Sequence, residues 1–272
     1  MAIDQAYQRR QQDAEGRFYQ KIANQGPRKV DEGTTQGRYL ATADGVLLGF
    51  NNNRDTERLL ELMREALKTA QPHAVEVIEA GASDPKYVYG PPEGGMVVRV
   101  NSRILGGYEE TTDEWTKMFQ EGMGRDNFWI RPDEHEALVK GEVPDSLLVR
   151  LARFHLVDNT RGEPPMWEAN EIAKKAVELK DGKLSGSLHL KTASGEREFK
   201  VDLLGYVEVK EGKITRFDLV AKGLFRGEGA FTRGAPKGDF PLGIAFRLAD
   251  GSDLADGIPP QGSRGWLDGY LK

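Results

Sequence analysis

The last third of the sequence alternates between short apolar runs and turn residues, and this pattern restricts the fold more than any other feature. From Lys183 onward, apolar and polar side chains alternate as they do in strands with one buried face. Gly, Asp and Lys separate the runs, which is typical of antiparallel strands. The expected strands lie in KLSGSLHLKT, REFKVDLLGYVEVKEG, KITRFDLVAKGLF and PLGIAFRLADG. A mainly antiparallel β domain follows, in which Gly205 is expected to mark a bulge or a close backbone approach.

The segment before these strands is predicted to be mainly helical. MVVRVNSRIL alternates as a strand, and TTDEWTKMFQEGM, RPDEHEALVKG and PDSLLVRLARFHL each carry a helix pattern. Pro132 and Pro144 stand at early helical positions, where the missing N–H of proline is not needed. Gly141 ends the first of these two helices. We therefore expect a β-rich domain over residues 96–272, with a helical insertion over about residues 111–180.

The first 70 residues predict a smaller unit made of two helices and a hairpin. A helix is expected over residues 13–22, and GRYLATADGVLLGF gives two strands joined at Asp44-Gly45. This residue pair tolerates positive φ in a two-residue turn. Asp55 is expected to cap a second helix, in which apolar residues recur at three- and four-residue spacing. Proline and glycine are frequent in residues 71–95, which are interpreted as a linker with one short strand at AVEVIEA.

The order of helix, strand, Asp-Gly hairpin, strand and helix resembles the closing half of a thioredoxin fold, as in bacterial thioredoxin-like proteins. The resemblance covers residues 1–70 and implies a partial thioredoxin-like α/β unit without the first strand and helix of that fold. The chain departs from the family because it lacks Cys-x-x-Cys and has TTQG in place of the proline before the third strand. The resemblance therefore implies a redox-inactive unit. RLARFHLVDNTRGEPPMW and the β segments after it resemble the remainder of such proteins, without an attached activity. The fold class expected for the whole chain is α+β.

Composition excludes several classes of protein. The 272 residues include no cysteine, so the chain has no disulfide, thiolate nucleophile or cysteine metal ligand. The formal net charge is −5, and acidic and basic residues are interspersed along the sequence. This distribution does not give the basic face of a nucleic-acid binder, so no nucleic-acid partner is expected. No apolar run approaches the roughly 18 residues of a membrane-spanning helix. The first twenty residues do not form a secretory signal, so the compartment is left open, and a gene start further upstream would fit a periplasmic or secreted protein.

Neither a metal site nor another cofactor is expected. His135 stands between Glu134 and Glu136, but neighbouring side chains of a helix point in different directions and cannot converge on one ion. These carboxylates are interpreted as a solvated start of a helix. His73 is interpreted as a linker residue, and His189 as an exposed residue on the polar face of a strand.

The densest group of polar side chains lies where a helix is expected to run into a loop, in RFHLVDNTRGEPPMW. In a catalytic interpretation, His155 accepts a proton and Asp158 orients it. In a binding interpretation, Arg161 holds an anion with two N–H groups. The structural alternative is a latch, in which Arg161 and Asn159 fasten the loop. The candidate catalytic residues are His155 and Asp158, and the candidate binding residues are Arg153, Asn159, Arg161 and Trp167.

A Gly-rich stretch, GLFRGEGAFTRGAPKGDFPLG, is the second candidate region. It lacks the spacing G-x-x-x-x-G-K-[ST] and does not open a helix, so a phosphate-binding loop is not predicted. A long hairpin loop is expected instead. The alternative is a small anion site formed by Arg226, Arg233 and Lys237.

Three functions stay open. The expected one is a non-catalytic protein that binds a small molecule or another protein, because no nucleophile stands in a recognisable motif. The second is an enzyme, a hydrolase or lyase, with its site around His155. The third is a truncated form of a thiol-disulfide oxidoreductase whose redox half is encoded upstream.

Overall fold

The chain divides into two compact units, Met1–Tyr89 and Gly90–Lys272. The computed structural model describes residues 9–71, 74, 79, 81–84, 90–263 and 266–272. It contains helices and an extensive antiparallel sheet, which confirms the α+β class. His73 and most of the strand expected at AVEVIEA lie outside the described residues. No helix of the described residues is long and apolar enough to cross a membrane.

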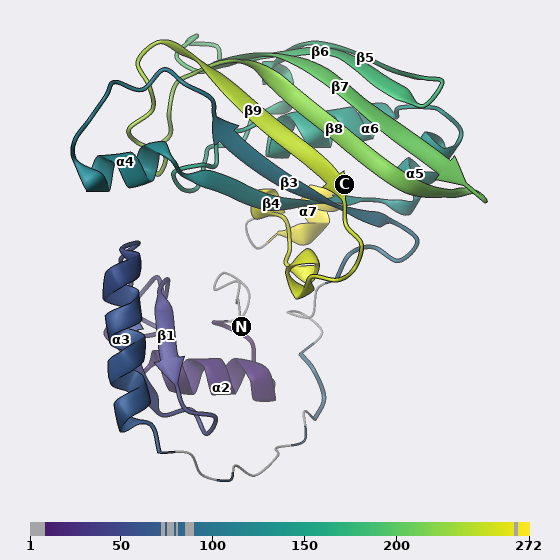
Figure 1. Cartoon of the computed structure of the whole chain (residues 1–272). Coiled ribbons are helices and arrows are strands. Elements are labelled where there is room, and N and C mark those ends of the chain that lie inside the picture. Colours follow the sequence, from purple (N-terminus) through teal and green to yellow (C-terminus); the bar gives the residue numbers. More distant parts are fainter. Residues whose placement is uncertain (1–8, 72–73, 75–78, 80, 85–89, 264–265) are drawn as a thin grey trace. The chain divides into compact units, whose positions relative to one another are not determined.

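The described part of the first unit contains two helices and a hairpin, in the order that the sequence predicts (Figure 1). Asp13 and Asp55 cap the two helices through hydrogen bonds from backbone N–H groups. The bond from Gly16 N–H contributes most to lowering the pKa of Asp13 to about 2. The elements are α2 (Ala14–Ala23), β1 (Arg38–Ala41), β2 (Leu47–Asn51) and α3 (Thr56–Thr69).

The hairpin turn differs from the two-residue turn expected at Asp44-Gly45. The N–H of Thr42 donates to the carbonyl of Val46 at 2.9 Å, and the pairing register shifts after Leu40. A two-residue turn of the expected type needs positive φ at both central residues. Here Gly45 has a φ of 82° while Asp44 does not have a positive φ. The turn is therefore longer and is held by Thr42.

The second unit is built on a seven-stranded antiparallel sheet with the strand order β4-β3-β9-β8-β7-β6-β5. Its strands are β3 (Met96–Ile104), β4 (Met123–Ile130), β5 (Ile172–Lys180), β6 (Lys183–Lys191), β7 (Glu198–Lys210), β8 (Lys213–Arg226) and β9 (Asp239–Leu248). Burial alternates along β7, β8 and β9, so one face of the sheet is covered and the other faces solvent. Gly205 is a close backbone approach, as expected, because a Cβ there would lie 2.3 Å from the carbonyl oxygen of Asp218.

Helices of the second unit pack on the covered face of the sheet, with the exception of α4, which lies away from that face and has no buried residue (Figure 1). Pro132 stands at the start of α5, as the sequence predicts. The next helix ends in a π-helical turn, in which the N–H of Leu156 donates to the carbonyl of Leu151 at 3.0 Å. The helices are α4 (Glu114–Gln120), α5 (Pro132–Val139), α6 (Asp145–Arg150), the π-helical turn η1 (Leu151–His155), the short 3-10 turns η2 (Ala169–Glu171), η3 (Leu254–Gly257) and η4 (Gln261–Ser263), and α7 (Leu267–Leu271).

The segment 111–180, expected to be a helical insertion, also contains strands β4 and β5. Neither strand alternates clearly between apolar and polar residues. The second half of β4 is buried on both faces, and β5 is an edge strand in which most residues are exposed. Lysines on such an edge discourage pairing with other chains. Asp113 caps α4.

We expect residues 90–272 to fold without the first unit, because this range contains a complete sheet and the helices that cover it. A purified fragment of this range should unfold in one cooperative transition. Circular dichroism during heating measures it, with the whole chain as the control. A fragment without a transition would contradict the division of the chain at residue 90.

Candidate functional site

His155 lies in a closed polar contact between three elements of the second unit. Its Nε2 lies 2.7 Å from the hydroxyl of Tyr270 on α7, and its Nδ1 lies 3.1 Å from a carboxylate oxygen of Asp126 on β4, without the alignment of a hydrogen bond. Asp126 in turn accepts hydrogen bonds from two backbone N–H groups. Burial raises the pKa of Tyr270, which keeps its hydroxyl protonated. The His155 side chain is fully buried, and it is not among the residues that line the pocket described below.

A buried ion pair stands beside this contact. Glu134 is completely buried and accepts a hydrogen bond from Arg150 at 2.8 Å, as well as one from Ser146 and one from the backbone of Arg131. The guanidinium of Arg150 also lies over the ring of Tyr270, 4.7 Å from its centroid. The interpretation of Glu134 as part of a solvated helix start is thus wrong. Its partner comes from α6, and the pairing compensates for burial of the charge.

Asp158 and Arg161 form a second buried ion pair in the segment that leaves η1. One oxygen of Asp158 accepts from the N–H and the hydroxyl of Thr160, and the other accepts from Arg161. The guanidinium of Arg161 also donates to the hydroxyl of Tyr108 at 3.1 Å. Asp158 therefore orients Arg161 and not His155.

The other candidate binding residues hold the same segment against the sheet. Asn159 accepts a hydrogen bond from the hydroxyl of Ser102 on β3. Arg153 donates to the carbonyl of Trp167 at 3.0 Å. The Trp167 ring is fully buried, donates to the carbonyl of Leu156, and lies under the guanidinium of Arg197. These contacts fix the path of residues 153–167.

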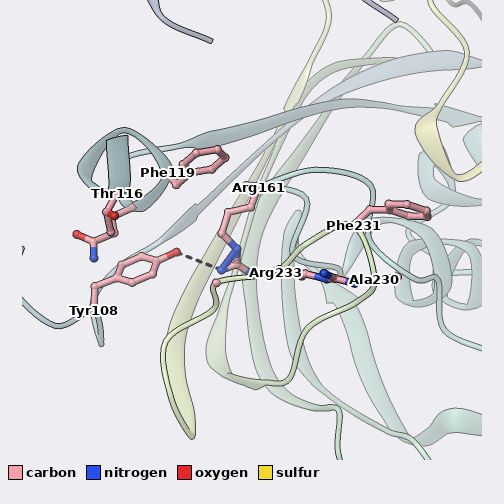
Figure 2. Close-up of a pocket in the computed structure, with 9 residues that line it drawn as sticks. Tyr108, Thr116, Phe119, Arg161, Ala230, Phe231 and Arg233 are labelled. Carbon is pink, nitrogen blue, oxygen red and sulfur yellow. Dashed lines mark hydrogen bonds between the residues drawn. The ribbon is translucent and has the colours of Figure 1, made fainter. Parts of the chain in front are cut away.

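A surface pocket of about 440 Å³ lies where this segment meets α4 and the loop between β8 and β9. Figure 2 shows Tyr108 and Arg161 joined by their hydrogen bond, with Phe119 on one side and Phe231 on another. The lining residues are Tyr108, Thr116, Phe119, Gln120, Arg161, Ala230, Phe231, Arg233 and Gly234. The pocket thus brings Arg161 together with a part of the Gly-rich stretch.

Glycines allow the loops around the pocket to approach closely. A Cβ on Gly162 would lie 2.1 Å from the carbonyl oxygen of Phe231, and a Cβ on Gly229 would lie 2.3 Å from the ring of Pro165. Gly122, just after α4, would place a Cβ 2.8 Å from the carbonyl oxygen of Thr160. Side chains at these positions would push the walls of the pocket apart.

The pocket carries an excess of positive charge. Arg161 is paired with Asp158, whereas Arg233 is exposed and makes no ion pair with any residue that the structure describes. Burial raises the pKa of Tyr108, so its hydroxyl stays protonated while it accepts from Arg161. Two aromatic rings supply apolar surface, and one of them, Phe231, is 72% exposed. The arrangement is suited to an anion attached to an apolar group.

The three cations of the Gly-rich stretch do not meet in one anion site. Arg226 pairs with Asp239 at 2.5 Å, and Lys237 pairs with Glu109 at 3.0 Å. Of these three cations, only Arg233 lines the pocket.

His189 lies 2.6 Å from Glu198, which lowers the pKa of that carboxyl group. Within the described ranges, no group of three His, Asp or Glu side chains is placed to hold a metal ion.

Comparison with known proteins adds no further guide to this site. No family model, curated protein or solved structure matches the chain. The chemistry of the pocket must therefore be inferred from its own geometry. Sequence reasoning found Arg161, but it missed Tyr108 and Phe119, which come from another part of the chain. Phe231 is an aromatic residue in a Gly-rich stretch, and this was the local signal in the sequence for an exposed apolar wall of the pocket.

Replacement of Arg161 by Ala is expected to destabilise the fold by about 3–5 kcal/mol, because it leaves the buried carboxylate of Asp158 without its charge partner. The free energy of unfolding in urea measures this loss. The double variant Asp158→Ala/Arg161→Ala should lose less than the sum of the two single variants. Arg233→Ala, which removes an exposed cation, is the control and should change stability by less than about 0.5 kcal/mol. A stable Arg161→Ala variant would mean that the ion pair does not hold the segment.

Proposed function

We propose that the protein is a non-catalytic binding protein whose second unit takes a small organic anion with an apolar part. The observation that carries the proposal is the position of Arg233, which makes no ion pair with a described residue, on the wall of a pocket that also contains the fixed Tyr108–Arg161 pair and two aromatic rings. A cation without a protein partner is available to a ligand. The rings favour a ligand that is not purely inorganic.

The size of the pocket fits this class of ligand. Its volume of about 440 Å³ lies within the range of roughly 300–1,000 Å³ that is usual for small-molecule sites. The Tyr108 hydroxyl accepts from Arg161, so its own proton can be donated to an anionic oxygen. A carboxylate between Tyr108 and Arg233 would gain charge-assisted hydrogen bonds, which are stronger than those of neutral groups.

The placement of His155 favours binding over catalysis around that residue. A general base must reach the proton that it removes. Both ring nitrogens of His155 already face protein groups, and its side chain is buried. The first unit serves in this proposal as a partial thioredoxin-like platform without thiol chemistry, since the chain has no cysteine.

Benzoate, benzyl alcohol and benzylamine test the proposal as small probes that differ in charge. We expect benzoate to bind better than the other two because only its carboxylate can pair with Arg233. Arg233→Ala should weaken benzoate binding by about tenfold, which corresponds to the loss of one charge-assisted hydrogen bond. Saturation-transfer NMR and titration of chemical shifts measure the affinities.

The matched control is Lys237→Ala, which removes a cation from the same loop that pairs with Glu109 and does not line the pocket. It should leave benzoate binding unchanged. Equal binding of the three probes, or equal losses in the two variants, would contradict the proposal.

A further inference from the structure

Helix α3 of the first unit exposes a row of apolar side chains. Leu60, Met63 and Leu67 are 43%, 43% and 76% exposed. Residues at this spacing lie on one side of a helix. The adjoining side of α3 faces the hairpin of its own unit, where Leu62 packs close to Gly49 on β2. The apolar surface of α3 is therefore wider than the hairpin that covers it.

The described part of the first unit has little apolar core of its own. Among its described residues, the buried apolar side chains are Tyr19, Ala23 and Ala66. A two-stranded hairpin is marginally stable in water unless it is covered by further structure. The exposed row on α3 is thus a place where additional contact would add stability.

A row of charged side chains runs beside the apolar row. Its members are spaced by four, three and four residues, so they share one side of the helix. The members are Glu57, Glu61, Arg64 and Lys68. The first half of this row is acidic and the second half is basic, which gives α3 a charge pattern that is complementary to itself in the reverse direction.

We propose that α3 binds α3 of a second copy of this chain in antiparallel orientation. A two-fold axis near Met63, perpendicular to both helices, places Leu60 opposite Leu67 of the other copy. The same axis keeps the two charged rows on one side of the interface. Glu61 then faces Arg64 of the other copy, and Glu57 faces Lys68. A parallel pair would place the charged rows on opposite sides and lose these ion pairs.

The interface is small, so the dimer should be weak and should depend on salt. A helix of 14 residues is about 21 Å long, and two such helices bury less surface than the roughly 1,200 Å² of a stable complex. Self-complementary charges at the edge of such an interface select the partner and its orientation.

Sedimentation velocity of the full chain tests this proposal, at protein concentrations from about 1 to 200 µM and at low salt. We expect a concentration-dependent equilibrium between monomer and dimer that shifts toward monomer when salt is added. Leu67→Gln should remove the dimer without unfolding the protein, because this side chain is mostly exposed. A chain that stays monomeric up to the highest concentration overturns the proposal, as does a dimer that survives Leu67→Gln.

Swapping the charges of two facing residues distinguishes an interface between the α3 helices of two copies from any other dimer contact. Glu61→Arg places a positive charge opposite Arg64 of the other copy. Because the two-fold axis repeats this contact, the repulsion occurs twice and should weaken the dimer by about tenfold. Glu61→Arg/Arg64→Glu restores the opposite charges and should restore the dimer. The control is Arg58→Glu, which lies on the side of α3 opposite the apolar row and should leave association unchanged. Failure of the double variant to restore the dimer, or a loss in the control equal to that of Glu61→Arg, overturns the antiparallel pairing.

Discussion

The buried ion pair between Asp158 and Arg161 is the interaction on which the second unit's pocket depends. Burial of two charges is costly, and their attraction compensates only when the remaining lone pairs and protons are also satisfied. Thr160 supplies two donors to Asp158, and Tyr108 accepts from Arg161. The pair therefore joins the segment after η1 to the loop before α4. The position of the pocket follows from the same contacts that hold these loops in place.

Buried polar contacts recur on the covered side of the sheet. The Glu134–Arg150 pair joins α5 to α6, and the hydrogen bond between His155 and Tyr270 joins η1 to α7. An apolar core alone would allow several ways of packing short helices against a sheet. Directional contacts that must be satisfied permit fewer of them. The polar residues that suggested an active site in the sequence are, for the most part, the residues that fix these helices.

The sequence predicted the elements whose pattern is local and missed those whose pattern depends on distant neighbours. The strands β6 to β9 alternate in burial and could be recognised from their own residues. β4 could not, because its second half is covered on both faces by elements from elsewhere in the chain. The burial of Glu134 depends on Arg150, which is 16 residues away in sequence, and no local pattern reveals that pair. The residues 153–167 were singled out for their density of polar groups, but density did not separate Arg161, which lines the pocket, from His155, which does not.

The two arginines of the pocket contribute to binding in different ways. Asp158 and Tyr108 hold the side chain of Arg161 in one position. A ligand that contacts Arg161 therefore does not lose binding free energy by ordering this side chain. The carboxylate of Asp158 already compensates the charge of Arg161, which reduces the attraction of Arg161 for a second anion. Arg233 differs in both respects, since no described residue pairs with its charge but its exposed side chain must be ordered when it binds. Selectivity for the shape of an anion should therefore come from Tyr108 and Arg161, and most of the dependence on charge from Arg233. A pocket built in this way tolerates loss of Arg233 without unfolding, because binding and stability depend on different side chains.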